Sequence, residues 1–181
     1  IGYCAYHGAG RKAVPRLLRD FGFNDLQIIT ENELNELNGL FPAFQDDPEQ
    51  QPDPGDTVAA DIAIDAFRKQ FGDEEYERQD ILLGTDPDAD RVGLITRVPE
   101  DQREAYDGKS HVLLDADDAW TLLLWYRFFR ESEANGGNLV DGEKKFIVLS
   151  HITTDALVRL GRKYGVGVVK TWVGFAMIAN S

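Results

Sequence analysis

The amino-acid sequence predicts an α/β fold made of two three-layer α/β/α units with mixed, largely parallel sheets. Two observations lead to this prediction. Short apolar runs of strand length alternate along the chain with longer segments whose apolar residues recur at helical spacing. The same alternation starts again in the second half, after a polar stretch at 99–110. We therefore expect one unit over residues 1–105 and a second over 106–181.

The first unit is expected to open with a strand at 1–6 and a helix at 12–21. The helix has apolar residues at helical spacing and a glycine just past its end, which is a typical stop signal. A short apolar run at 26–29 predicts the second strand. Residues 31–56 are rich in Asn, Pro, Asp and Gln, so we expect a long surface loop with a helical turn near 32–37.

A second helix is expected after this loop, with Asp56 or Thr57 as its cap. Its predicted apolar face holds, besides neighbouring alanines, Val58, Ile62 and Phe67. The acidic stretch 73–77 that follows is expected to be a solvated connector.

Two apolar runs, 81–83 and 92–95, predict strands on either side of an acidic loop. The polar stretch 99–110 has two interpretations: it links the two units, or it turns a hairpin back to a strand at 111–114.

The second unit is expected to begin with a strongly apolar helix at 117–130 that ends before the Asn- and Gly-rich break at 135–138. A stripe of Trp120, Leu124 and Phe128 is expected to face the core. The remaining expected elements are a strand at 146–149, a helix capped by Thr153 or Thr154 that runs to about 164, a strand at 166–169 and a turn at Gly174.

The composition is that of an acidic globular protein. A formal net charge of −13 without a basic patch argues against nucleic acid or an anionic membrane as a partner. Cys4, the only cysteine, lies in an apolar run, so we expect a buried core residue, no internal disulfide and a reducing compartment. With no signal peptide and no apolar run of membrane-spanning length, the expected location is the cytoplasm. The abrupt ends of the chain suggest a fragment of a longer protein.

The acidic loop between the two predicted strands is the most informative segment for function. Asp86, Asp88 and Asp90 stand at alternate positions, and Arg91 follows at once. Three carboxylates this close repel one another unless a cation or strong hydrogen-bond donors compensate their charge. Oxygen ligands of this kind suit Mg²⁺. The sequence therefore predicts a Mg²⁺ site, with an acidic loop that holds no metal as the alternative.

This loop, Asp86-Pro87-Asp88-Ala89-Asp90-Arg91, resembles the metal-binding loop of the α-D-phosphohexomutases, the phosphoglucomutase and phosphomannomutase superfamily. Other stretches resemble segments of that family, in the family's order. They are Tyr6 to Gly10, similar to the H-G-x-G opening of its second domain; Phe41-Pro42 with Pro52-Asp53-Pro54, similar to an F-P…N-P-E stretch but with Asp for Asn; Leu114 to Asp118, similar to the start of its third domain; and Val173-Gly174-Phe175, similar to the turn at the sugar end of its site.

The resemblance implies the family's second domain over residues 1–105 and the front part of its third over 106–181. It implies a phosphoryl shift within a hexose phosphate, which is the expected substrate. The phosphoserine that exchanges the phosphoryl group would lie outside this chain, in missing domains of the same protein. We therefore expect no catalytic nucleophile in these 181 residues, and no turnover by them alone.

The resemblance also assigns roles to individual residues. Asp86, Asp88 and Asp90 carry over as Mg²⁺ ligands, and Arg91 carries over as a phosphate-binding residue that could instead form a salt bridge. Gly174 and Phe175 carry over as candidate substrate-binding residues. Because Ala176 stands where many members have Lys, a plain turn with a core aromatic is the alternative there.

Two other functions remain open. An Asp-rich loop after a strand is also typical of Mg²⁺-dependent phosphatases of the haloacid-dehalogenase kind, in which Asp86 would be the nucleophile. The second alternative is a truncated binding module without catalysis. His7 lies beside glycines at a strand end, and we interpret it as a structural hydrogen-bonding residue.

Overall fold

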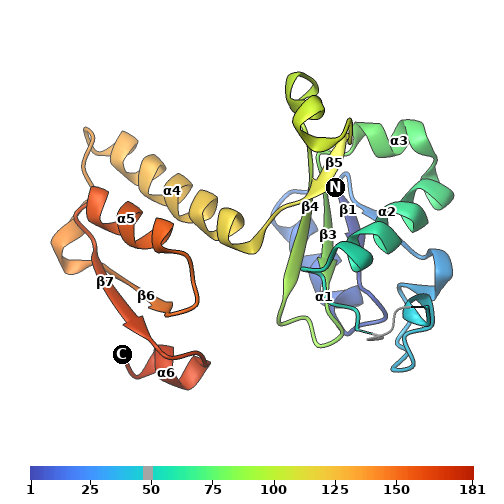
Figure 1. The fold of residues 1–181 in the computed structure, drawn as a ribbon, viewed down its shortest axis with the longest axis horizontal. Coiled ribbons are helices and arrows are strands. Elements are labelled where there is room, and N and C mark those ends of the chain that lie inside the picture. The colour runs from blue at the N-terminus through green and yellow to red at the C-terminus, as the bar shows by residue number, and fades with distance from the viewer. Residues whose placement is uncertain (47–50) are drawn as a thin grey trace. The chain divides into compact units, whose positions relative to one another are not determined.

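The computed structural model describes residues 1–46 and 51–181 and divides the chain into two compact units, Ile1–Leu114 and Asp115–Ser181 (Figure 1). Each unit combines helices with a β-sheet, so the predicted α/β class is confirmed. Among the described residues, no helix has both the length and the apolar character needed to cross a lipid bilayer.

The sheet of the first unit has five strands in the order β2-β1-β3-β4-β5. Their bounds are β1 Gly2–Cys4, β2 Gln27–Ile28, β3 Ile81–Thr85, β4 Val92–Arg97 and β5 His111–Leu113. β1 pairs in parallel with β2 and with β3, whereas the β3–β4 and β4–β5 pairs are antiparallel. The sheet is therefore mixed, as predicted, but it is not largely parallel: the pairs made by β1 are parallel and the pairs made by β4 are antiparallel.

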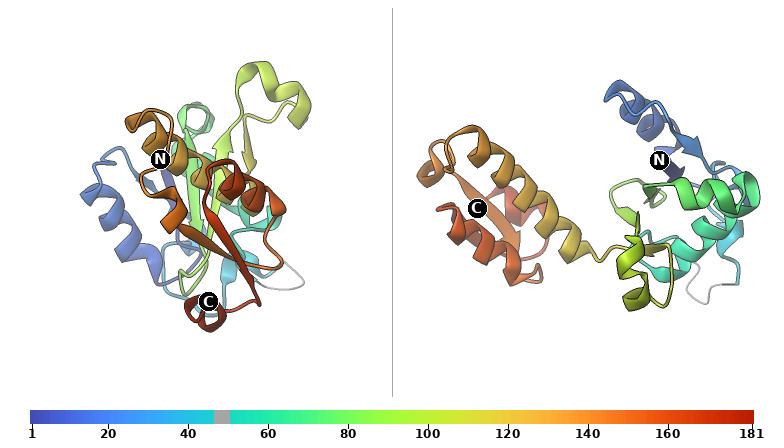
Figure 2. Two further views of the ribbon diagram at one scale, coloured as in Figure 1. Left: turned by 90° about the vertical axis from the view of Figure 1, so that its left-hand side faces the viewer. Right: turned by 90° about the horizontal axis from the view of Figure 1, so that it is seen from above.

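Helices cover both faces of this sheet. Their bounds are α1 Gly10–Asp20, α2 Thr57–Phe71 and α3 Asp73–Arg78. A Cβ added to Gly2 of β1 would lie 3.1 Å from the Phe67 ring of α2, whereas one added to Gly10 of α1 would lie 2.5 Å from the Tyr3 hydroxyl of β1. Because successive strand residues point to opposite faces, α1 and α2 lie on opposite sides of the sheet (Figure 2).

Helix α2 begins where the sequence predicts, because Asp56 Oδ1 accepts a hydrogen bond from the Val58 amide at 3.0 Å. The prediction that Val58 belongs to the apolar face is wrong, since it is 44% exposed. The inner face instead follows the helical period through small residues, which let the helix lie close to the sheet. Its buried residues are Ala59, Ala60, Ala63, Ala66 and Phe67.

The segment 31–56 is not a surface loop throughout, contrary to the prediction. Short 3₁₀ helices occupy Glu31–Glu33 and Pro42–Phe44. Leu34 and Phe44 are fully buried and belong to the core of the first unit. Part of the predicted loop, 47–50, lies outside the described residues.

The acidic stretch 73–77, expected as a connector, is also different: it forms most of helix α3. Asp73, Glu74 and Glu75 fall in the first turn, where the positive end of the helix dipole stabilises them. Tyr76 is buried, with its ring 4.5 Å from the ring of His111 in β5. Downstream, the chain passes from β4 through a 3₁₀ helix at Glu100–Tyr106 into the antiparallel β5, so the hairpin interpretation of 99–110 is confirmed.

The second unit has three helices and two strands among the described residues. They are α4 Ala116–Ala134, β6 Phe146–Ser150, α5 Asp155–Lys163, β7 Gly167–Thr171 and α6 Phe175–Ala179, with a 3₁₀ turn at Gly142–Lys144. β6 and β7 pair in parallel. Asp115 caps α4 and Thr154 caps α5, each by accepting a backbone N–H.

The predicted core stripe of α4 is only partly correct. Phe128 is buried, with its ring 5.2 Å from that of Tyr164. Trp120 is 59% exposed, however, and Leu124 is only half-buried.

Pro54 and its neighbours pack directly against β4. Pro54 is buried, and a Cβ added to Gly93 of β4 would overlap the Pro54 carbonyl oxygen. Asp53 stabilises this turn because its Oδ1 accepts a hydrogen bond from the Gly55 amide at 2.9 Å. The absence of a side chain at Gly93 therefore lets the 52–55 turn lie on the sheet.

His7 connects three parts of the first unit. Its amide donates to the Leu34 carbonyl at 2.9 Å, its carbonyl accepts from the Asn38 amide at 3.3 Å, and its Nε2 accepts from the Ala43 amide at 3.3 Å. The ring is buried, and burial lowers the pKa of His7 below its ordinary value. Because Nε2 is an acceptor, the neutral ring fits this site, and these contacts favour the structural interpretation of His7.

We expect Gly93→Ala to lower the free energy of unfolding of the chain by about 1–3 kcal/mol, because the added methyl group must displace the 52–55 turn. Chemical denaturation measures this change. Gly39→Ala is the matched control, since nothing lies within 4 Å of a Cβ added at Gly39. Equal stability of Gly93→Ala and wild type would contradict the close packing of Pro54 on β4.

The buried His7 should also make stability depend on pH. Its folded pKa is lowered, so its contribution is complete above about pH 6.5, the ordinary histidine pKa, and is lost as the pH falls from there toward the folded pKa. His7→Gln keeps an acceptor for the Ala43 amide but does not titrate, so its unfolding free energy should fall less over this range.

Chemical denaturation at a series of pH values gives the comparison. His111, whose pKa burial also lowers, should supply part of the dependence that remains. An identical pH dependence in His7→Gln and wild type would show that His7 is not held neutral.

Candidate metal centre

The acidic loop leaves the sheet at the carboxyl end of β3. Thr85 is the last residue of β3, and the chain returns at Val92, the first residue of the antiparallel β4. The turn that follows the neighbouring parallel strand β1 lies against it: the Ala9 amide donates to the Pro87 carbonyl at 2.8 Å. A Cβ added to Gly8 would lie 2.6 Å from Pro87 Cα, so this close approach requires glycine. Two strand ends therefore support the loop.

The backbone of the loop is curled tightly. The Ala89 amide donates to the Asp86 carbonyl at 3.0 Å, and Ala89 has a φ of +61°, in the left-handed region. The Arg91 amide then donates to Asp86 Oδ1 at 2.9 Å. The side chain of Asp86 thus holds the far end of its own loop.

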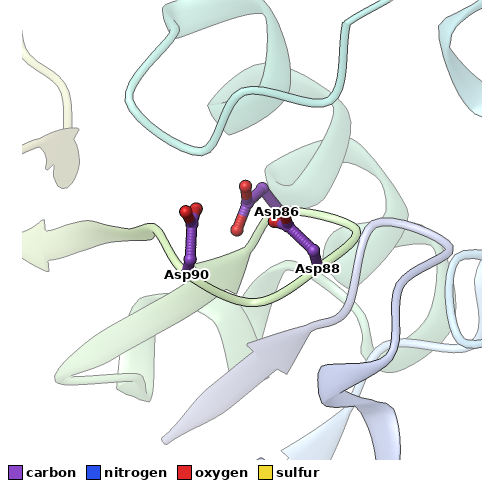
Figure 3. Close-up of side chains that lie close together, drawn as sticks. All are labelled: Asp86, Asp88 and Asp90. Atoms are coloured by element: carbon purple, nitrogen blue, oxygen red, sulfur yellow. The ribbon is translucent and has the colours of Figure 1, made fainter. Parts of the chain in front are cut away.

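The curl brings the three predicted ligands together (Figure 3). One carboxylate oxygen from each of Asp86, Asp88 and Asp90 can be chosen so that all three lie within 4.8 Å of one another. Asp86 is buried, whereas Asp88 and Asp90 are exposed. The arrangement has one fixed carboxylate at its base and two that reach solvent.

The pKa values of Asp86 and Asp90 shift in opposite directions. Burial by itself would raise the pKa of Asp86, but hydrogen bonds from the Arg91 amide and guanidinium hold it below its usual value. The negative charge of Asp88 is the largest cause that raises the pKa of Asp90, and the charge of Asp86 contributes in the same direction. The repulsion between carboxylates therefore acts on the exposed Asp90, and a bound cation would relieve it.

Arg91 lies between two carboxylates. Its Nε donates to Asp86 Oδ2 at 3.0 Å, and its Nη1 donates to Asp53 Oδ2 at 2.5 Å. Its Nε is also 3.8 Å from Asp90 Oδ1. These ion pairs are the salt-bridge role that the sequence left open for Arg91, and its side chain is still 52% exposed.

Asp53 is the residue at this site that sequence reasoning did not identify as a contact. It comes 38 positions before Arg91. One signal in the sequence pointed to it: Asp53 stands where the family that the chain resembles usually has Asn. The replacement adds a negative charge, which needs a partner.

A hollow of about 460 Å³ opens above the loop, lined by the three aspartates and Arg91 on one side and by Phe41, Gln51 and Pro52 on the other. Three hard oxygen donors with open space beside them fit a small divalent cation that keeps water or phosphate oxygens as further ligands. The residues present therefore suit Mg²⁺.

Gly174 and Phe175 belong to the second unit. Gly174 has a φ of +125° and immediately precedes α6, so the predicted turn is present. Phe175 is 83% exposed, and the expectation of a core aromatic at this position is wrong among the described residues. Its neighbours in α6 are not buried either.

Cys4 and the Ser150-His151 pair offer no nucleophile in this structure. Cys4 is buried, as predicted, and burial raises the pKa of its thiol to about 12. The Ser150 hydroxyl pairs with that of Thr153 at 2.9 Å, while the His151 ring lies against Trp172 with centroids 4.8 Å apart.

Comparison with known proteins gives concordant results. A phosphoglucomutase of Staphylococcus aureus strain MRSA252 is 24% identical over 181 residues, which is 99% of this chain. The chain spans only 27% of the length of that relative.

Two solved structures share the fold. A Thermus thermophilus protein assigned as a phosphomannomutase aligns with 96% of this chain and 31% of its own, at a TM-score of 0.61 and 22% identity. A phosphoglucomutase/phosphomannomutase family protein of Burkholderia thailandensis aligns with 99% of this chain and 30% of its own, at a TM-score of 0.62 and 17% identity.

The family model for the phosphoglucomutase/phosphomannomutase α/β/α domain II matches residues 1–98. This range is more than half of the chain and contains β1 to β4 and the acidic loop. The chain therefore belongs to the phosphoglucomutase/phosphomannomutase family, with its domain II in the first unit.

Proposed function

We propose that this chain supplies the Mg²⁺-binding loop of a phosphohexomutase, an isomerase that shifts a phosphoryl group within hexose phosphates. The phosphoserine that takes part in the transfer would lie in other domains of the same protein. The second unit, Asp115–Ser181, would form the front part of the next domain of such an enzyme. The observation that carries the proposal is the convergence of Asp86, Asp88 and Asp90 within the domain II match.

The chain's own residues would divide the work. Asp86 would be the anchored ligand, because its two oxygens are oriented by the Arg91 amide and guanidinium and each keeps a lone pair for a cation. Asp88 and Asp90 would complete the triad from the solvent side. Bound Mg²⁺ would neutralise charge on the transferring phosphoryl group, which is its usual part in such reactions.

Arg91 would contribute to phosphate binding. A guanidinium has five N–H donors, and Asp86 and Asp53 take two of them, so the others can bind phosphate oxygens. Gly174 and Phe175 would be substrate-binding residues of the whole enzyme, as the family resemblance implies. The exposed Phe175 ring is able to stack on a sugar face.

The geometry of Asp86 argues against a phosphatase in which this residue is the nucleophile. Both of its oxygens accept hydrogen bonds from Arg91, and the side chain is buried. These hydrogen bonds stabilise the negative charge of the carboxylate and so make it a weaker nucleophile. A fluoroberyllate adduct on Asp86, detected by ¹⁹F NMR and located by mutation, would support the phosphatase instead.

We expect Mg²⁺ to raise the unfolding temperature of the chain. At a Mg²⁺ concentration about 100 times its Kd, the free energy of unfolding should rise by about 2.7 kcal/mol. Asp88→Asn should weaken Mg²⁺ binding by at least about tenfold. Mutating a residue that only supports a metal ligand commonly costs this much affinity, so the loss of a direct ligand should cost no less. Calorimetric Mg²⁺ titration of both proteins measures the two Kd values.

Asp80→Asn is the matched control. Asp80 immediately precedes β3 as Asp86 follows it, it is exposed, and its replacement removes the same charge at the other end of the strand. Its Mg²⁺ affinity should equal that of wild type. Weak binding that is the same in all three proteins would contradict the metal site and favour a binding module without catalysis.

We also expect the 181 residues alone to show no phosphoglucomutase turnover, because they contribute no phosphoserine loop. A coupled assay with glucose 1-phosphate, Mg²⁺ and a glucose bisphosphate activator makes the measurement. Turnover that persists through purification and disappears in Asp88→Asn would overturn the assignment of the nucleophile to other domains.

A further inference from the structure

We infer that Asp53 is a positioning residue, which holds the Arg91 guanidinium beside Asp86 and limits its approach to Asp90, so that the triad stays open to a cation. The inference deepens the proposed function and rests on it for the identity of the cation. The contact between Asp53 and Arg91 itself does not depend on that proposal.

The two oxygens of Asp53 have separate partners. Oδ2 accepts from Arg91 Nη1 at 2.5 Å, while Oδ1 accepts from the Gly55 amide at 2.9 Å. The second bond orients the carboxylate within its own turn. Asp53 therefore presents a fixed acceptor to Arg91, which is a better partner than a freely rotating surface carboxylate.

The turn that carries Asp53 is itself fixed on the sheet. Pro52 and Pro54 are both buried, and the Pro54 carbonyl lies where a Cβ of Gly93 would stand. Gly93 is two residues after Arg91, at the start of β4. The distance between the turn and the base of the Arg91 side chain is therefore set by close packing.

Arg91 has another carboxylate within reach. Asp90 Oδ1 is 3.8 Å from Arg91 Nε, and Asp90 is exposed and unfavourably close to the other two charges of the triad. A guanidinium released from Asp53 would gain by moving toward Asp90. It would then neutralise one proposed ligand and occupy space that a cation needs. Asp53 limits this competition by engaging Nη1 in a hydrogen bond of its own.

Asp53→Asn tests the inference with little disturbance of the fold. The amide oxygen of Asn can still accept from the Gly55 amide, but the ionic acceptor for Arg91 is lost. We expect the Nε–Hε resonance of Arg91, assigned by its absence in Arg91→Gln, to move or broaden in Asp53→Asn. We also expect Mg²⁺ affinity to fall by about tenfold. Asp80→Asn, which removes the partner of Arg97 at the other end of β4, should change neither.

The double variant Asp53→Asn with Arg91→Gln separates positioning from a simple loss of nearby charge. If Asp53 acts through Arg91, adding Asp53→Asn to Arg91→Gln should weaken Mg²⁺ binding no further. An equal loss of affinity in both backgrounds would overturn the inference, because the effect would then be electrostatic attraction alone. An unchanged Arg91 resonance in Asp53→Asn would also overturn it.

Failure of the proposed Mg²⁺ site would give a different experimental result from failure of the positioning role of Asp53. A wild-type chain that gives no response to Mg²⁺ contradicts the proposed function and the part of this inference that concerns the cation. In that case a displaced Arg91 resonance in Asp53→Asn still supports the positioning of Arg91 by Asp53.

Discussion

The buried charge of Asp86 is the constraint on which the rest of this site depends. A carboxylate removed from water is unfavourable unless donors replace its hydration. Arg91 supplies two of them, through its amide and its guanidinium. The first of these bonds closes the loop, and the second fixes the direction of the arginine. Arg91 alone therefore fixes the shape of the loop and stabilises the ionised form of Asp86 at its base.

The surrounding fold brings rigid elements to this point. β1 and β3 are parallel neighbours, so the turns at their carboxyl ends meet, and Gly8 permits the contact with Pro87. The 52–55 turn approaches from the other side and rests on Gly93. Both contacts require glycine because backbone meets backbone. The loop is thus held by packing on either side, while the carboxylates of Asp88 and Asp90 remain exposed.

Much of this organisation could be predicted from local patterns. The α/β class, the strands on both sides of the loop and the caps at Asp56 and Thr154 all have signals within a few residues. Other features depend on contacts between distant segments. The burial of Leu34 depends on the turn at His7, to which it is hydrogen-bonded, and the role of Asp53 depends on a partner 38 residues away. A polar composition around such residues conceals their burial.

Binding of a hard divalent ion at the loop tests the central claim most directly. Mn²⁺ accepts the same oxygen ligands as Mg²⁺ and broadens nearby NMR signals because it is paramagnetic. Added in trace amounts to the ¹⁵N-labelled chain, Mn²⁺ should selectively broaden the amide signals of residues 86 and 88–91, and excess Mg²⁺ should restore them. Broadening that instead follows the general distribution of acidic residues, including the first turn of α3, would contradict a metal site at Asp86, Asp88 and Asp90.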